Sequence, residues 1–349
     1  MLFLKKLYRY IYLLRLKLLI LTASIPLIGG VIADNDLSCK QLFSLFAIGV
    51  SAHIFGFGLN DIIDKKLDEK SPLRISSPLV NGKISIKIIW LIVIMQVPFS
   101  NYIYLSILDA NLIGIILLNL SVILSIVYNV FSKYSKFPKI IAELSLACSV
   151  AVILLAGFFA ISEAITLKIG LLALCLFLVL HLLNSIPSGL KDLKYDYLNR
   201  AKSFIIVWGC KMKNEYEVII SKKIVYYAIF LQVILYIVLI YTAYIFNLKW
   251  FNFIFISFFS TLSFLHLYEL LQKKDYYEML TFKPLLSGFY SYLAFLIILV
   301  DKIPLFFYLT HIVVFISLIK NIRHDYKFSL KSFKIFFSEK HWKINNKFA

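Results

Sequence analysis

Apolar residues fill most of this chain in long stretches that short polar segments interrupt. A helical stretch of about 20 apolar residues crosses the roughly 30 Å hydrocarbon core of a bilayer. Stretches such as 113–127 and 150–161 have almost no polar face, which a helix of a soluble protein needs. The pattern predicts an all-α polytopic membrane protein, with spans at 11–33, 41–60, 85–107, 110–130, 139–161, 165–187, 224–246, 250–272, 283–300 and 305–321.

The first and last apolar stretches each allow more than one assignment. The first stretch follows Lys5, Lys6 and Arg9 as a signal peptide would, but it is long and no small-residue cleavage site follows it, so we interpret it as a retained helix. Only 301–304 separates the last two stretches, so nine spans with a re-entrant segment stay an alternative to ten. We expect a membrane domain at 1–321, folded as a bundle around a central cavity, and a basic tail at 322–349.

Charge indicates how the chain is oriented in the membrane. Lys and Arg number 37 against 19 Asp and Glu, and the basic residues flank the apolar stretches. Nucleic-acid binding is therefore not expected, whereas contact with membrane lipid is. Basic loops alternate with loops that are not basic, which predicts a cytoplasmic (inner) membrane protein with both termini in the cytoplasm. The basic loops are 61–84, 131–138, 188–223 and 273–282.

Two clusters of carboxylates follow the second and sixth stretches. Asn60, Asp64 and Asp68 share one helical face at spacings of four residues, with Asp61 beside them. Asp192 and Asp196 repeat that spacing, and Arg200 extends the same face by another turn. Acids at the edge of hydrocarbon are costly unless they are solvated, paired or metal-bound. Four crossings separate the clusters, so both lie on the cytoplasmic face, where such oxygen ligands suit Mg²⁺.

Basic residues surround both clusters, which indicates that the metal-bound group is an anion such as a diphosphate. The candidates for contacting it are Arg74, Lys133, Lys191 and Lys202. Lysine and arginine neutralise the charge that develops on a leaving diphosphate. The alternative is that acids and bases at helix ends form a solvated rim.

Four further residues are candidates for the acceptor or for the cavity. His53 precedes Asn60 by about two helical turns, and Asn184 precedes the second cluster in a similar way. Glu143 is an acid inside a span and a potential general base. Tyr128 ends the fourth span, before Lys133. Each has a structural alternative, as a hydrogen-bonded packing residue or a partner of a loop lysine.

The motifs together resemble the UbiA superfamily of intramembrane prenyltransferases over residues 11–300. The first family signature, NDxxDxxxD with a later Pro-Leu and Gly, is met by Asn60 to Asp68 and by 78–82. The second is partly met by Asp192, Asp196 and Ser203. The stretch 128–133 is similar to the family's Tyr and Lys segment, and 14–17 is similar to the basic start of its first helix. Ser77 stands where the family has Arg, Arg200 aligns with a Gly, and the last helix is extra.

This resemblance implies a reaction. Asp61, Asp64, Asp192 and Asp196 would act with Mg²⁺ on an allylic isoprenyl diphosphate, and the prenyl group would pass to a small aromatic acceptor of the kind used in quinone biosynthesis. Asn60 and Asp68 would complete the metal ligands. A transporter or lipid-binding protein with cation-binding acids is an alternative, although transporter sites usually lie near the bilayer midplane. A non-catalytic family member is another.

Overall fold

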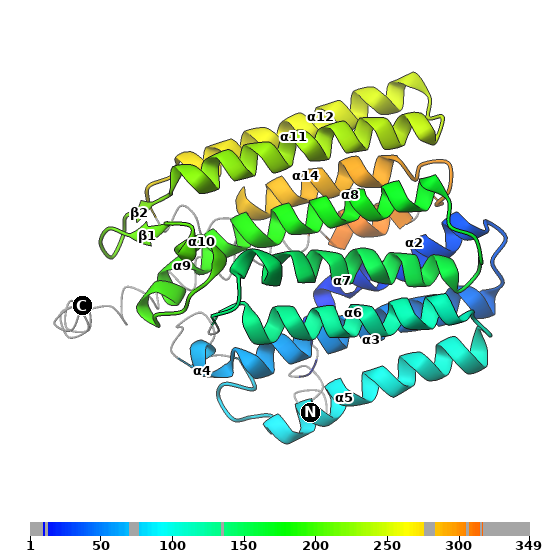
Figure 1. Ribbon diagram of the computed structural model, residues 1–349, viewed down its shortest axis with the longest axis horizontal. Coiled ribbons are helices and arrows are strands. Elements are labelled where there is room, and N and C mark those ends of the chain that lie inside the picture. The colour runs from blue at the N-terminus through cyan, green and yellow to red at the C-terminus, as the bar shows by residue number, and fades with distance from the viewer. Residues whose placement is uncertain are drawn as a thin grey trace.

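The protein is a bundle of long, roughly parallel and antiparallel helices (Figure 1). The computed structural model describes residues 10, 13–69, 77–133, 136–275, 283–304, 307–314 and 316. The longer helices are α2 (Leu19–Ala33), α3 (Cys39–Ile63), α5 (Ile86–Tyr102), α6 (Leu112–Phe131), α7 (Lys139–Phe159), α8 (Leu167–Leu183), α11 (Lys222–Ile245), α12 (Trp250–Gln272) and α14 (Lys283–Ile297). The shorter elements are η1 (Leu16–Leu18), α4 (Lys65–Asp68), η2 (Ile103–Ile107), η3 (Asn184–Ser188), α9 (Gly189–Leu198), α10 (Phe204–Val207), and strands β1 (Lys211–Met212) and β2 (Val218–Ile219).

The described helices confirm the all-α membrane class. Seven are long and apolar enough to cross a membrane, while Leu19–Ala33 and Leu286–Ile297 are shorter apolar helices. The expected span 165–187 continues through the π-helical turn η3 into α9, so this helical segment reaches Leu198. Of the expected last span, 307–314 is helical, and the rest of it and the tail 322–349 lie almost wholly outside the described residues.

Local signals set where several helices begin. Ser38 and Gln41 form a capping box at the start of α3, in which the Ser38 Oγ accepts from the Gln41 N–H and the Gln41 side chain accepts from Ser38. Asn111, Thr166 and Ser221 each cap the first turn of the following helix with a side-chain oxygen. These polar residues interrupt the apolar pattern where a helix must satisfy its free N–H groups.

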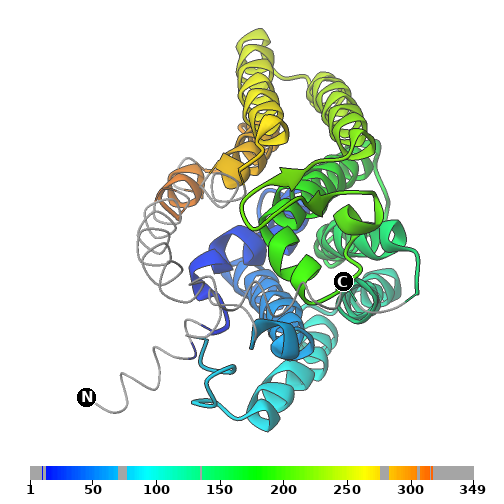
Figure 2. The same cartoon turned by 90° about the vertical axis from the view of Figure 1, so that its left-hand side faces the viewer.

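The short elements gather at one end of the bundle. Figure 1 shows α4, α9, α10 and the β1–β2 hairpin at the left-hand end, and Figure 2 looks onto that end. The strands pair antiparallel, Lys211 with Ile219 and Met212 with Val218. Helix α4 follows α3, and α9 continues α8, so two segments far apart in sequence reach the same end of the molecule.

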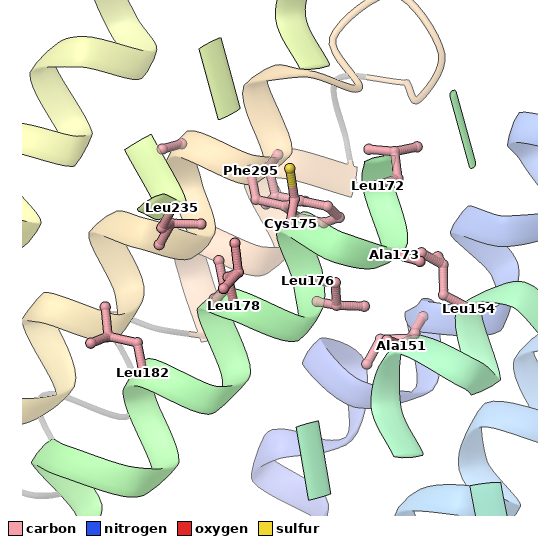
Figure 3. Close-up of a cluster of buried hydrophobic side chains, with 14 of the residues drawn as sticks. Ala151, Leu154, Leu172, Ala173, Cys175, Leu176, Leu178, Leu182, Leu235 and Phe295 are labelled. Atoms are coloured by element: carbon pink, nitrogen blue, oxygen red, sulfur yellow. The ribbon is translucent and has the colours of Figure 1, made fainter. Parts of the chain in front are cut away.

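An apolar core lies between α7, α8, α11 and α14 (Figure 3). Leu154 of α7, Leu176 of α8, Leu235 of α11 and Phe295 of α14 are fully buried there. Because lipid is as apolar as these side chains, such packing stabilises the bundle mainly through close van der Waals contact.

Two glycines bring α2 especially close to its neighbours. A Cβ atom on Gly49 of α3 would overlap the backbone carbonyl of Ala23, and one on Gly157 of α7 would overlap the carbonyl of Pro26. Helix α2 is therefore wedged between α3 and α7 at distances that only glycine permits. These contacts hold α2 against the middle of α3 and the last turns of α7.

Candidate functional site

The first aspartate cluster lies where α3 ends. The Asp64 N–H donates to the Asn60 carbonyl at 2.9 Å, and the Asp68 N–H donates to the Asp64 carbonyl at 2.9 Å, so the helical turn runs on into α4. The Asn60 amide also donates to the Asp64 carboxylate at 3.1 Å. Asp61 and Asp64 are only 5% and 8% exposed. Two carboxylates are thus held close together and largely out of water.

Arg15 reaches this cluster from the segment before α2. Its guanidinium lies 2.6 Å from the Asp61 carboxylate and 3.4 Å from the side-chain oxygen Oδ1 of Asn60, and it stacks over the Phe57 ring at 4.8 Å. Arg15 has a backbone φ of 50°, in the left-handed region. It was not among the expected site residues, although the stretch 14–17, which is similar to the basic start of the family's first helix, was a signal for it.

Lys133 joins the first cluster to the second. Its ammonium lies 3.2 Å from Asp64 and 3.7 Å from Asp196, whose carboxylate comes from α9. Burial by itself lowers the pKa of Lys133, but the carboxylates of Asp64, Asp196 and Asp192 act against burial and hold that pKa above its ordinary value. The structure therefore brings both clusters and one loop lysine together at one end of the bundle.

The oxygen donors at this end suit a hard divalent cation. In the described part of the chain, no three His, Cys, Asp or Glu side chains converge into a ready-made metal cage. Mg²⁺ needs no such cage, because one or two carboxylates plus substrate phosphates usually hold it. Arg15 and Lys133 provide positive charge between the carboxylates, so the residues fit a site completed by a metal-bound diphosphate.

The other expected diphosphate contacts lie less centrally. Lys191 is exposed, and its ammonium is 3.9 Å from Asp192. Lys202 is also exposed, and its backbone N–H donates to the Lys133 carbonyl at 2.8 Å, which ties the two loops together. Arg74 lies outside the described residues. Lys133 is the expected lysine that contacts both clusters.

Arg200 does not extend the face of the second cluster as expected. Helix α9 ends at Leu198, and Arg200 follows in the left-handed conformation with φ of 56°. That conformation favours glycine. It supplies a physical reason why a glycine would suit this position.

Three of the interior candidates form one hydrogen-bonded group. The side-chain amide of Asn184 donates to the Glu143 carboxylate at 2.7 Å and to the Tyr128 hydroxyl at 3.2 Å. Tyr128 is near the end of α6, Glu143 is one turn into α7, and Asn184 begins η3. The spacing of these three residues along the sequence did not predict that their helices bring them together.

His53 lies apart from this group. Its Nδ1 is 2.6 Å from the Thr22 hydroxyl, and its Nε2 is 2.8 Å from the Leu14 carbonyl oxygen. The side chain is buried and its ring packs against Phe57. These contacts match the structural alternative, in which His53 fastens the segment before α2 to α3.

Comparison with known proteins identifies the family of this chain. Residues 23–293 match the UbiA prenyltransferase family, so the chain belongs to this family. No curated protein matches the chain in sequence. With its apolar helices, membership of this family makes the chain an integral membrane protein.

Solved structures share the fold at low sequence identity. A UbiA homolog from Archaeoglobus fulgidus bound to DMAPP and Mg²⁺ has a TM-score of 0.57 and 15% identity, covering 83% of this chain and 99% of that one. The same homolog bound to GPP and Mg²⁺ has a TM-score of 0.57 and 16% identity, with the same coverage. An apo UbiA homolog from Aeropyrum pernix K1 has a TM-score of 0.61 and 14% identity, covering 82% and 98%.

Proposed function

We infer that the protein is a Mg²⁺-dependent prenyltransferase that transfers a prenyl group from an allylic isoprenyl diphosphate to a small aromatic acceptor, as in quinone biosynthesis. The observation that carries this proposal is Lys133, which lies between Asp64 and Asp196 and so joins the two aspartate clusters at one end of the bundle. Structures of a fold relative have been solved with DMAPP and Mg²⁺ and with GPP and Mg²⁺, which supports the same ligands here.

The carboxylates and amide of the two clusters would hold the metal. These residues are Asn60, Asp61, Asp64, Asp68, Asp192 and Asp196. Bound Mg²⁺ supplies positive charge that stabilises diphosphate as the C1–O bond ionises. Arg15 and Lys133 add guanidinium and ammonium donors beside the same carboxylates, where they are placed to bind diphosphate oxygens. The chain's own contribution is thus to orient the diphosphate and neutralise its growing charge.

The site is proposed to face the cytoplasm. The loops that carry the clusters and Lys133 are the basic ones, which stay on the cytoplasmic side of an inner membrane. Both termini would lie on that side, with 1–321 as the membrane domain and 322–349 as a basic tail. An apolar cavity among the helices would take the isoprenoid tail, so that the substrate never has to leave the lipid.

Release of diphosphate tests the proposal directly. Purified protein is given farnesyl, geranylgeranyl and longer allylic diphosphates with an aromatic acceptor panel, in Mg²⁺ or in EDTA. We expect Mg²⁺-dependent release that Asp64→Asn and Asp192→Asn abolish, and that Asp36→Asn preserves, because Asp36 is exposed in the α2–α3 loop at the opposite end. A wild-type protein that binds no allylic diphosphate would refute the proposal and favour a transporter or a non-catalytic member.

A further inference from the structure

Glu143 is a buried acid that the diphosphate chemistry does not use. Its side chain belongs to the second turn of α7, and the residue is only 8% exposed. Its carboxylate accepts a hydrogen bond from the neutral amide of Asn184 at 2.7 Å and also interacts with the Ser185 side chain. Among the described residues it forms no salt bridge with a cation. A carboxylate inside a membrane bundle that forms no salt bridge indicates a functional site.

This carboxylate lies next to the diphosphate region. The Asn184 amide donates hydrogen bonds to both Glu143 and the Tyr128 hydroxyl. Tyr128 lies near the end of α6, five residues before Lys133 in the sequence. Electrostatic interactions link Glu143 to Lys133 and Asp196, and link Tyr128 to Lys133 and Asp64. An acceptor that meets the allylic carbon from the membrane side of the diphosphate would therefore encounter Glu143 and Tyr128.

The charges around this position favour one class of acceptor. In the described part of the chain, Lys133 is a cation that interacts electrostatically with Glu143, and it is already shared by Asp64 and Asp196. A carboxylate on the acceptor would place a further negative charge beside Glu143, and like charges in contact are strongly unfavourable. A neutral hydroxyl can instead donate a hydrogen bond to the Glu143 carboxylate, which can accept it beside the side chains of Asn184 and Ser185.

We propose, building on the prenyltransferase function above, that Glu143 selects a neutral acceptor with an aromatic hydroxyl and accepts the proton of that hydroxyl. The C1–O bond of the allylic diphosphate breaks, and its electron pair leaves with diphosphate. The acceptor O–H proton passes to a Glu143 carboxylate oxygen. The electron pair left on the acceptor forms the new bond to C1, either at the oxygen or at a conjugated ring carbon. In the second case the proton on that ring carbon leaves and the oxygen takes up a proton, which restores the aromatic hydroxyl. Asn184 and Tyr128 act as positioning residues.

Matched acceptor pairs test this selection. The pairs are 4-hydroxybenzyl alcohol with 4-hydroxybenzoate, and 1,4-dihydroxynaphthalene with 1,4-dihydroxy-2-naphthoate. The measured quantity is the ratio of kcat/KM for the neutral acceptor to that for the carboxylated one, by product chromatography. We expect the wild type to favour the neutral member by about 10²-fold, as a like-charge contact of several kcal/mol requires. The control is Glu163→Gln, because Glu163 is exposed in the α7–α8 loop at the other end of the bundle.

Two substitutions at Glu143 separate charge from structure. Glu143→Gln keeps an oxygen for Asn184 but removes the charge, so the ratio should fall toward one while the rate with the neutral acceptor drops about 10²-fold or more. Glu143→Asp keeps the charge on a shorter arm, so it should slow the reaction yet retain the ratio. It also keeps the test valid if the Gln variant does not fold.

Different results would refute acceptor selection by Glu143 and the prenyltransferase function on which it rests. A wild type that prefers carboxylated acceptors overturns the selection, as does a folded Glu143→Gln protein with an unchanged ratio or a Glu143→Asp protein that loses it. Absence of diphosphate release from every allylic diphosphate is a different result, which refutes the prenyltransferase function itself. Retained Mg²⁺-dependent binding of the allylic diphosphate by the variants shows that the fold is intact.

Discussion

Replacing Lys133 with methionine should make the protein depend on Mg²⁺ for its stability. The ammonium lies 3.2 Å from Asp64 and 3.7 Å from Asp196, and the three side chains are 20%, 12% and 5% exposed. At an effective dielectric constant of about 20, each contact is an attraction of about 4–5 kcal/mol. Desolvation of the three charges offsets much of this gain.

The net loss follows from what the substitution leaves behind. Methionine fills similar volume but leaves two buried carboxylates without their shared cation, a change that typically costs about 3–5 kcal/mol. The Asn60 amide still donates to Asp64, so we expect the lower end of this range. At about 2–4 °C per kcal/mol, a loss of about 3 kcal/mol lowers the unfolding midpoint by roughly 6–12 °C. Mg²⁺ that binds the same carboxylates should restore part of it.

Thermal unfolding in detergent measures this effect without any turnover. Wild type, Lys133→Met and Lys136→Met are compared in EDTA and in excess Mg²⁺. Lys136 belongs to the same loop but is exposed, so its loss should change the midpoint by little in either condition. Two results would show that Lys133 does not neutralise Asp64 and Asp196. One is an equal unfolding midpoint for Lys133→Met and Lys136→Met in EDTA. The other is a difference in midpoint between Lys133→Met and wild type that Mg²⁺ does not reduce.

Two further predictions concern the backbone. Gly157→Ala should lower the free energy of unfolding by about 1–3 kcal/mol, since its Cβ overlaps the Pro26 carbonyl of α2, whereas Gly170→Ala meets no atom within 4 Å and should be neutral or stabilising. Thermal midpoints check both, and equal midpoints would contradict the close packing. Arg200→Gly should be about 1 kcal/mol more stable than Arg200→Ala, because both remove the guanidinium but only glycine relieves the left-handed backbone; denaturant or thermal midpoints that coincide would count against this.

Much of the fold follows from local rules. A long apolar stretch in lipid must satisfy its backbone hydrogen bonds internally, so stretches such as 112–131 and 222–245 become helices whatever surrounds them. The spacing of Asn60 and Asp64 likewise predicts their shared face, since one helical turn separates them. The resemblance to the family could also be recognised from the sequence, because the family's signatures are short and continuous.

Other features depend on contacts between distant residues. No local rule indicates that Arg15 meets Asp61, that Lys133 lies between Asp64 and Asp196, or that Asn184 holds Glu143. Even the conformation of Arg200 is not given by its residue type, because left-handed backbone is unfavourable for any residue with a Cβ.

Local sequence patterns therefore specify the membrane class, the helices and the positions of the acids along them. Packing of the helices specifies which charges share a partner, and it places the neutral amide of Asn184 against Glu143. The physical reason is that helix formation in lipid is an intrasegment hydrogen-bonding requirement. Pairing across the bundle depends instead on how closely helices approach, and here glycine contacts such as that of Gly157 with Pro26 set that approach.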